Sequence, residues 1–137
     1  MDKRVTMETF NLEIVTPNGV IFDGKAQEAT LPGSEGEFGV LPGHVSTITL
    51  MEAGIIDFIK ENGVKESVVI NWGYVNVSEN NVSALVQGAV AIKGEDESEV
   101  AAALSDAKEL LNSVADSSIA MASVVSRMEQ AAQNIIG

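Results

Sequence analysis

The sequence predicts an α+β fold, mainly β, with an N-terminal antiparallel β-sandwich or flattened barrel followed by a C-terminal antiparallel α-helical hairpin. As far as Ile92, short apolar-polar runs are separated by turn residues, which is typical of strands. The polar residues 93–96 then interrupt the chain, and beyond them apolar residues recur at helical spacing. We therefore expect a β domain over residues 1–94 and a two-helix hairpin over residues 95–137.

The first strands are predicted from alternation. Phe10, Leu12 and Ile14 alternate with polar residues, the period of a half-buried strand. Residues 17–19, Pro-Asn-Gly, indicate a turn, after which residues 20–22 continue the hairpin. Residues 25–31 are predicted to form a third strand.

The remaining strands are rich in β-branched residues and are separated by turn signals, including Asn62-Gly63 and the polar residues 78–81. Short strands with regular turns favour a sandwich or a flattened barrel. The expected strands cover residues 45–51, 55–60, 64–71, 74–77, 82–87 and 89–92.

A glycine-rich acidic loop, LPGSEGEFGVLPGH, spans residues 31–44 and contains four glycines and two prolines. Glycine permits a positive φ and proline fixes φ, so such a loop has a defined shape. It should hold Glu35, Glu37 and His44 at fixed positions on one end of the β domain. A phosphate-binding loop is excluded, because no lysine follows the glycines and two carboxylates would repel phosphate. A simple pair of turns remains the alternative.

The helical hairpin is predicted from a cap and two apolar stripes. Asp96 and Glu99 form a capping-box-like start, and acidic residues suit the first turn of a helix. Residues 116–118 break the pattern before the second helix. The first stripe comprises Val100, Ala103, Leu104, Ala107, Leu111 and Val114, and the second Met121, Val125, Met128, Ala132 and Ile135.

The hairpin should be weakly held, because alanine buries little apolar area and short helices need packing to persist. Two packings, one folded back on the β domain and one extended along a partner, could then be close in free energy. A single fixed hairpin is the alternative.

The net charge of −12 argues against nucleic acid and anionic membrane surfaces as direct partners, since both attract Lys and Arg. No apolar run is long enough to span a bilayer, so we expect no direct lipid insertion. The first ten residues lack the apolar core of a signal peptide. The absence of cysteine fits a reducing cytoplasm and excludes thiolate metal sites.

No constellation for catalysis is visible. His44 is the single histidine, and a general base needs a positioned partner, for which Glu35 and Glu37 are the nearest candidates. A structural or contact role is expected for His44 instead. No nucleophile elbow and no EF-hand loop occurs, so catalytic residues, metals and cofactors are all predicted to be absent. Trp72 and Tyr74 are interpreted as core packing, with a binding face as the alternative.

The loop with the residues that follow it, LPGSEGEFGVLPGHVSTITLMEAG, closely resembles the epsilon subunits of bacterial F-type ATP synthases. The segments FNLEIVTPNGVIFDG and INWGYVNVSENNVSALV extend the resemblance over nearly the whole chain. It implies a non-catalytic rotor subunit of the central stalk that binds the gamma subunit and the ring of c subunits. Glu35, Glu37 and His44 would face the ring. The chain would work peripherally at the cytoplasmic face of the inner membrane and be monomeric in isolation.

The resemblance also implies that the helices can extend toward the beta subunit and inhibit ATP hydrolysis. From Glu95 onward, however, only Lys108 and Arg127 are basic against eight acidic residues, so electrostatic docking on an acidic surface should be poor. The residues expected to serve this regulatory role are Val100, Leu104, Leu111, Met121, Val125, Arg127 and Met128.

Some epsilon subunits bind ATP through an [IL]-D-x-x-R-A motif at the start of the first C-terminal helix. The matching positions here hold Glu97, Ser98, Ala101 and Ala102, so the aspartate and the phosphate-binding arginine are both missing. We expect weak or no ATP binding. Two alternative functions remain. The first is an ATP-sensing regulatory module, against which the degraded motif argues, and the second is a small β-sandwich binding protein or enzyme.

Overall fold

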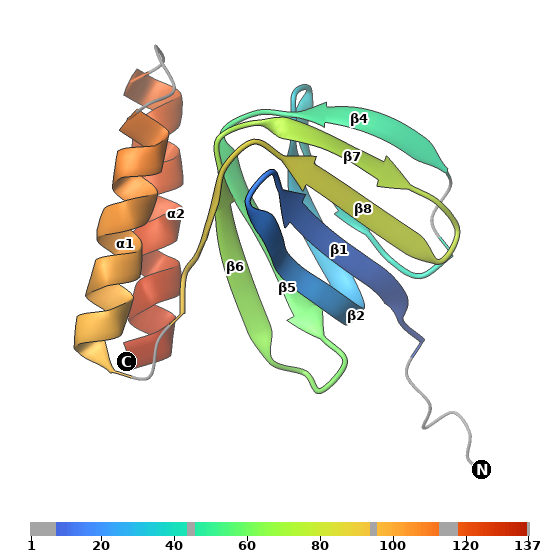
Figure 1. Cartoon of the computed structure of the whole chain (residues 1–137), viewed down its shortest axis with the longest axis horizontal. Helices are drawn as coiled ribbons and strands as arrows, with labels where there is room; N and C mark the ends of the chain where they lie inside the picture. The colour runs from blue at the N-terminus through green and yellow to red at the C-terminus, as the bar shows by residue number, and fades with distance from the viewer. Residues whose placement is uncertain (1–7, 44–45, 94–95, 113–117, 137) are drawn as a thin grey trace.

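A computed structural model of the chain describes residues 8–43, 46–93, 96–112 and 118–136. These residues form nine strands followed by two helices, which confirms the predicted fold class (Figure 1). The strands are β1 (Phe10–Thr16), β2 (Gly19–Gly33), β3 (Gly36–Val40), β4 (Thr47–Met51), β5 (Gly54–Lys60), β6 (Lys65–Ile70), β7 (Gly73–Val77), β8 (Asn81–Val86) and β9 (Ala89–Ala91). The helices are α1 (Glu97–Asn112) and α2 (Ser118–Ile136).

The sheet closes into a flattened barrel, because β1 pairs with both β2 and β8. The strand order β1-β8-β7-β4-β2 returns to β1, and β5, β6 and β9 continue the sheet from β2. One pairing differs from the expected antiparallel pattern, since β1 and β8 are parallel. A closed circuit of five strands cannot alternate in direction throughout, so one parallel pair is a geometric requirement.

The second strand is longer than predicted. Residues 20–22 and 25–31 belong to one continuous strand, β2, because Asp23 and Gly24 pair with Glu13 and Leu12 of β1 and so extend the ladder between them. The acidic loop is also partly strand. The end of β2 and the start of β3 form a tight hairpin closed by Gly33 and Gly36, and Gly36 has a φ of 125°.

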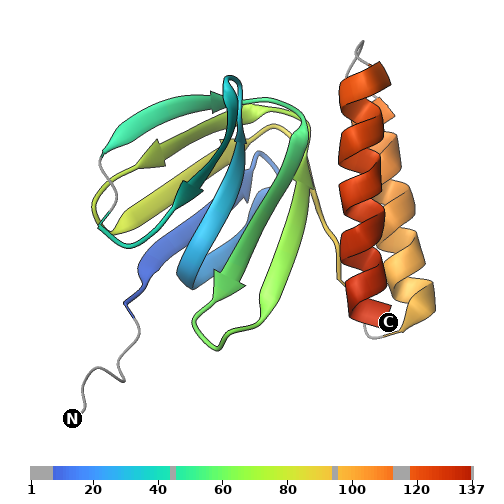
Figure 2. The same cartoon turned by 180° about the vertical axis from the view of Figure 1, so that it is seen from behind.

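Two apolar clusters stabilise the fold. The first fills the barrel and includes Leu12, Leu31, Ile56 and Phe58. The second lies between the outer face of β5 and β6 and the helices, which stand together beside that face (Figure 2). Because β5 and β6 are covered on both faces, neighbouring residues such as Ile55 and Ile56 are both buried, and the alternation expected of a half-buried strand is lost there.

The second cluster is formed by residues of both helices and of the sheet. Its helix residues are Val100, Ala107, Leu111, Met128 and Ala132, which pack with Ile55 and Val69 of the sheet and with Ile92, the residue after β9. Leu104 and Val125 pack at its margin.

The expected cap of α1 is present, because the Glu99 N–H donates to Asp96 Oδ1 at 2.9 Å. One position of the second stripe was predicted wrongly. Ile135 is 43% exposed, since it lines an open groove beside the seam. The side chains of Val114 and Met121 lie outside the described residues, as do residues 94–95, and the domain boundary placed there stays a prediction.

Candidate interaction surfaces

An apolar strip covers the outer face of β4, β7 and β8. It consists of Ile48, Leu50, Trp72, Tyr74 and Leu85, whose exposed fractions are 71%, 64%, 53%, 43% and 37%. We call these five residues the outer strip. Leu50 lies opposite Tyr74, and Tyr74 lies opposite Leu85, so these three side chains form one cross-strand row on one face. Clustered apolar side chains in water are typical of surfaces that bind another protein.

The outer strip corrects the interpretation of the two aromatic residues as core packing. Gly73, Val75 and Val77 point inward along β7, so Tyr74 points outward by strand alternation. Trp72 lies in the turn before β7, where Asn71 Oδ1 accepts hydrogen bonds from the N–H groups of Trp72 and Gly88, each at 2.8 Å. The backbone that carries Trp72 is therefore fixed.

A hollow of about 290 Å³ adjoins the aromatic end of the outer strip. Its lining includes Pro17, Trp72, Tyr74 and Leu85. A partner side chain of moderate size would fit there, which adds shape to an otherwise flat sheet face. The sequence signal for this surface is the alternation along β7. If Gly73 points inward, then Val75 and Val77 do too, and Tyr74 between them points outward.

The β2–β3 hairpin carries the predicted acidic residues. Glu35 and Glu37 are both exposed. The hairpin is fixed to the end of β4, because the Ser34 N–H donates to the Leu50 carbonyl at 2.9 Å and the Glu52 N–H donates to the Pro32 carbonyl at 3.1 Å. This end of the barrel thus places the hairpin beside the outer strip. His44 lies outside the described residues, and the role of all three residues as partner contacts stays a prediction.

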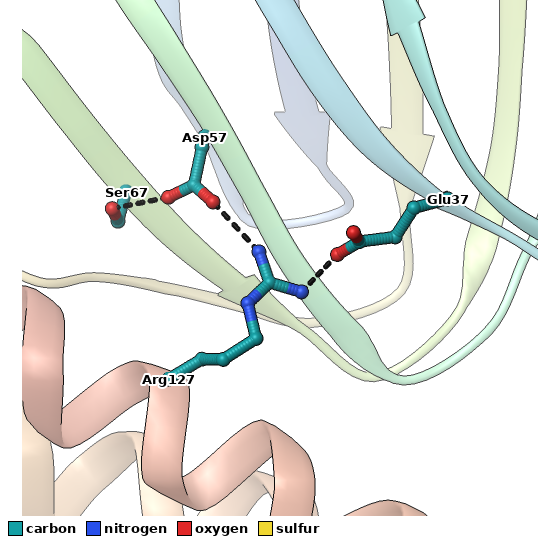
Figure 3. Close-up of polar contacts among 4 residues, drawn as sticks. All are labelled: Glu37, Asp57, Ser67 and Arg127. Atoms are coloured by element: carbon teal, nitrogen blue, oxygen red, sulfur yellow. Dashed lines mark hydrogen bonds and ion pairs between the residues drawn. The ribbon is translucent and has the colours of Figure 1, made fainter.

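Glu37 also takes part in an ionic cluster that joins α2 to the sheet (Figure 3). Arg127 donates from Nη1 to Glu37 Oε2 and from Nη2 to Asp57 Oδ2, the latter at 2.8 Å. The other oxygen of Asp57 accepts a hydrogen bond from Ser67 Oγ at 2.6 Å. Sequence reasoning did not identify Asp57 or Ser67, although an aspartate inside the apolar run GIIDFIK was a visible signal.

A groove of about 720 Å³ runs between α2 and the outer face of β5 and β6. Its walls mix carboxylates, Arg127 and Lys65 with apolar side chains. Over the described ranges, no group of three or more His, Cys, Asp or Glu side chains is arranged to hold a metal ion. No described helix is long and apolar enough to cross a bilayer. The positions that match the nucleotide motif, Glu97, Ser98, Ala101 and Ala102, are exposed on the first turns of α1.

Comparison with known proteins identifies the family. Residues 9–106 match the family described as "ATP synthase, Delta/Epsilon chain, beta-sandwich domain". The ATP synthase epsilon chain of Sulfurimonas denitrificans is 58% identical over 130 residues, which cover 95% of this chain and 100% of that one. The epsilon chain of Wolinella succinogenes is 52% identical over 128 residues, covering 93% and 98% of the two chains.

A solved structure agrees with this result. A chain in the structure of the Euglena gracilis mitochondrial ATP synthase, OSCP/F1/c-ring, superposes with a TM-score of 0.59 at 26% identity, covering 93% of this chain and 76% of that one. The similarity therefore spans the barrel and the helices together. The chain belongs to the ATP synthase epsilon chain family.

Proposed function

We propose that this chain is a non-catalytic rotor subunit of the central stalk of an F-type, proton-translocating ATP synthase. It couples rotation of the c ring to the catalytic head through the gamma subunit, and it works peripherally at the cytoplasmic face of the inner membrane. The observation that carries the proposal is the 58% identity to an epsilon chain over 95% of the sequence. In isolation the chain is a monomer.

Two adjoining surfaces suit two partners. The outer strip offers exposed aromatic and aliphatic side chains, the residue types that supply most binding energy at the centre of an interface, and is assigned to the gamma subunit. The tip of the β2–β3 hairpin offers carboxylates, which form strong charge-assisted hydrogen bonds with arginine, and is assigned with His44 to the polar loops of the c ring. The hydrogen bond from Ser34 to Leu50 links the two surfaces, so both partners would be held by one rigid end of the barrel.

The helices are assigned a regulatory role. Among the described residues of the hairpin that are buried against the sheet, Ala107 and Ala132 are alanines with little area to bury. A hairpin held in this way can detach and extend toward the beta subunit, where it would inhibit ATP hydrolysis. This assignment divides the chain into a β domain ending near residue 94 and a mobile hairpin.

The defining experiment adds this chain to enzyme depleted of its epsilon subunit, either at full length or ending at residue 94. Proton pumping driven by ATP should return with both forms, whereas inhibition of hydrolysis should return only with the full-length chain. Recovery of the chain with the stator, or its absence from the purified enzyme, would contradict the proposal.

Reversing the charge of Glu37 should weaken coupling. In the Glu37→Lys variant a carboxylate that pairs with ring arginines is replaced by a repelling cation, so ATP-driven proton pumping should fall more than ATP hydrolysis does. Arg127→Gln is the matched control, because it breaks the same internal ion pair while leaving the charge of the hairpin tip intact. Wild-type pumping by Glu37→Lys would remove this residue from the ring contact.

The isolated chain should bind ATP weakly or not at all. Ala101 stands where the family motif has the arginine that forms paired hydrogen bonds with phosphate, and Ser98 stands where it has aspartate. Isothermal titration calorimetry should give no heat of binding at sub-millimolar ATP. A clear signal in that range would instead favour the ATP-sensing alternative.

A further inference from the structure

Arg127 connects the helical hairpin to two strands that are distant in sequence. Its guanidinium contacts Asp57 on β5 and Glu37 on β3, which are 70 and 90 positions away along the chain. The other described ion pair of the hairpin, between Lys108 and Glu129, joins α1 to α2 and does not reach the sheet. Among the ion pairs of the described residues, those of Arg127 join the hairpin to the barrel.

The two carboxylates that hold Arg127 are not equivalent. Asp57 is directly opposite Ser67 in the β5–β6 ladder, and the Ser67 hydroxyl fixes one of its oxygens while Arg127 occupies the other (Figure 3). Glu37 lies on the β2–β3 hairpin, and its side chain is about as exposed as that of Asp57, 46% against 43%, so the difference lies in the second hydrogen bond and not in exposure. Within the part of the chain that the structure describes, its carboxylate has no second polar partner.

The ion pairs of Arg127 join two parts of the chain that both carry negative charge. The chain carries a net charge of −12, and the part from Glu95 onward has eight acidic residues against two basic ones, so packing the hairpin on the barrel brings two acidic parts of the chain together. Arg127 places one cation between two carboxylates at that junction. This cation therefore adds an electrostatic attraction to the apolar packing that holds the hairpin on the sheet.

We propose that Arg127 is an ionic latch that holds the helical hairpin on the sheet, with Asp57 as its fixed anchor and Glu37 as its releasable anchor. A cationic side chain of a partner bound at the β2–β3 hairpin would compete with Arg127 for Glu37. Binding at that tip would therefore loosen the hairpin. The latch is a property of the isolated chain, whereas the competition rests on the proposed function.

The latch can be tested on the full-length chain, which contains no cysteine and so accepts labels at chosen positions. Spin labels at Glu61→Cys, in the β5–β6 turn, and Gln133→Cys, on α2, report the distance between barrel and hairpin. At low salt, Asp57→Asn should raise the detached-to-attached ratio about five-fold and Glu37→Gln about two-fold, and Arg127→Gln, which loses both contacts, about ten-fold. Exchange of the α2 amides with deuterium should accelerate in the same order among the variants, because a detached hairpin loses the packing that stabilises its helices.

Lys108→Gln is the matched control, because it breaks an ion pair of similar exposure within the hairpin and should change neither measurement. Screening predicts that the effect of Arg127→Gln shrinks as salt rises toward 1 M. Equal behaviour of Arg127→Gln and Lys108→Gln would overturn the latch.

The competition is tested in the assembled enzyme with the same labels. Assembly should increase detachment in the wild-type chain more than in Glu37→Gln, because that variant has already lost the releasable anchor. An equal response of the two chains would overturn the competition. Failure of the chain to join the enzyme would contradict the proposed function and leave the measurements on the isolated chain valid.

Discussion

Replacing Gly73 by alanine should lower the free energy of unfolding by about 3 kcal/mol, the upper part of the usual range for overpacking a core. A Cβ at this position would lie 2.3 Å from the Leu85 carbonyl oxygen and 2.7 Å from the Val86 Cα. Both are backbone atoms of β8, the strand that pairs with β7. Because no side-chain rotation can relieve the contact, the two strands would have to separate.

Thermal unfolding followed by circular dichroism measures this effect, and the midpoint should fall by roughly 10 °C. Gly39→Ala is the control, since Gly39 also lies in a strand but its Cβ would meet only the Ala29 carbonyl oxygen at 3.9 Å. That variant should be as stable as the wild type or slightly more stable. An unchanged midpoint for Gly73→Ala would contradict the close approach of β7 and β8.

Local signals predicted the strands and the helix start because their causes are local. The alternation from Phe10 to Ile14 reflects a strand with one buried face, and the structure buries all three apolar residues. Asp96 caps α1 through a bond to a residue three positions away. Signals of this kind need no knowledge of which distant segments meet.

Features that depend on distant contacts could not be predicted in the same way. The parallel pair of β1 and β8 follows from closure of the barrel, which no local pattern records. The consecutive buried residues Ile55 and Ile56 look like an ordinary apolar run until the helices are seen to cover the outer face. Trp72 and Tyr74 were assigned to the core because aromatic residues are usually buried, whereas the strand phase turns Tyr74 outward.

The candidate sites also differ in whether they depend on local sequence or on contacts between distant residues. The exposure of Glu35 and Glu37 follows from a glycine-rich hairpin, whose tip projects from the barrel. Asp57 and Arg127 were not recognised as a pair because 70 residues separate them, and each alone resembles an ordinary charged residue. Only the packing of α2 on β5 gives the two side chains a common role.

The outer strip should carry most of the affinity for the gamma subunit. Changing Leu50 and Tyr74 together to serine should weaken that binding at least 30-fold, which corresponds to a loss of about 2 kcal/mol from the centre of an interface. Leu50 is 64% and Tyr74 43% exposed in the isolated chain, so the main cost to its stability should be the loss of one cross-strand pair. Surface plasmon resonance with immobilised gamma subunit measures the affinity, and thermal unfolding verifies the fold.

Val64→Ser separates a specific surface from a general loss of apolar area. Val64 is 49% exposed, comparable to the residues of the outer strip, but it lies beside the β5–β6 turn, and β2 separates β5 from the strands of the strip in the strand order. A partner that recognises the strip would bind this variant with wild-type affinity. If instead the Leu50 and Tyr74 variant bound gamma as tightly as the wild type, gamma would have to bind another face of the barrel. The hydrogen bond from Ser34 to Leu50 would then not join the binding sites of two partners.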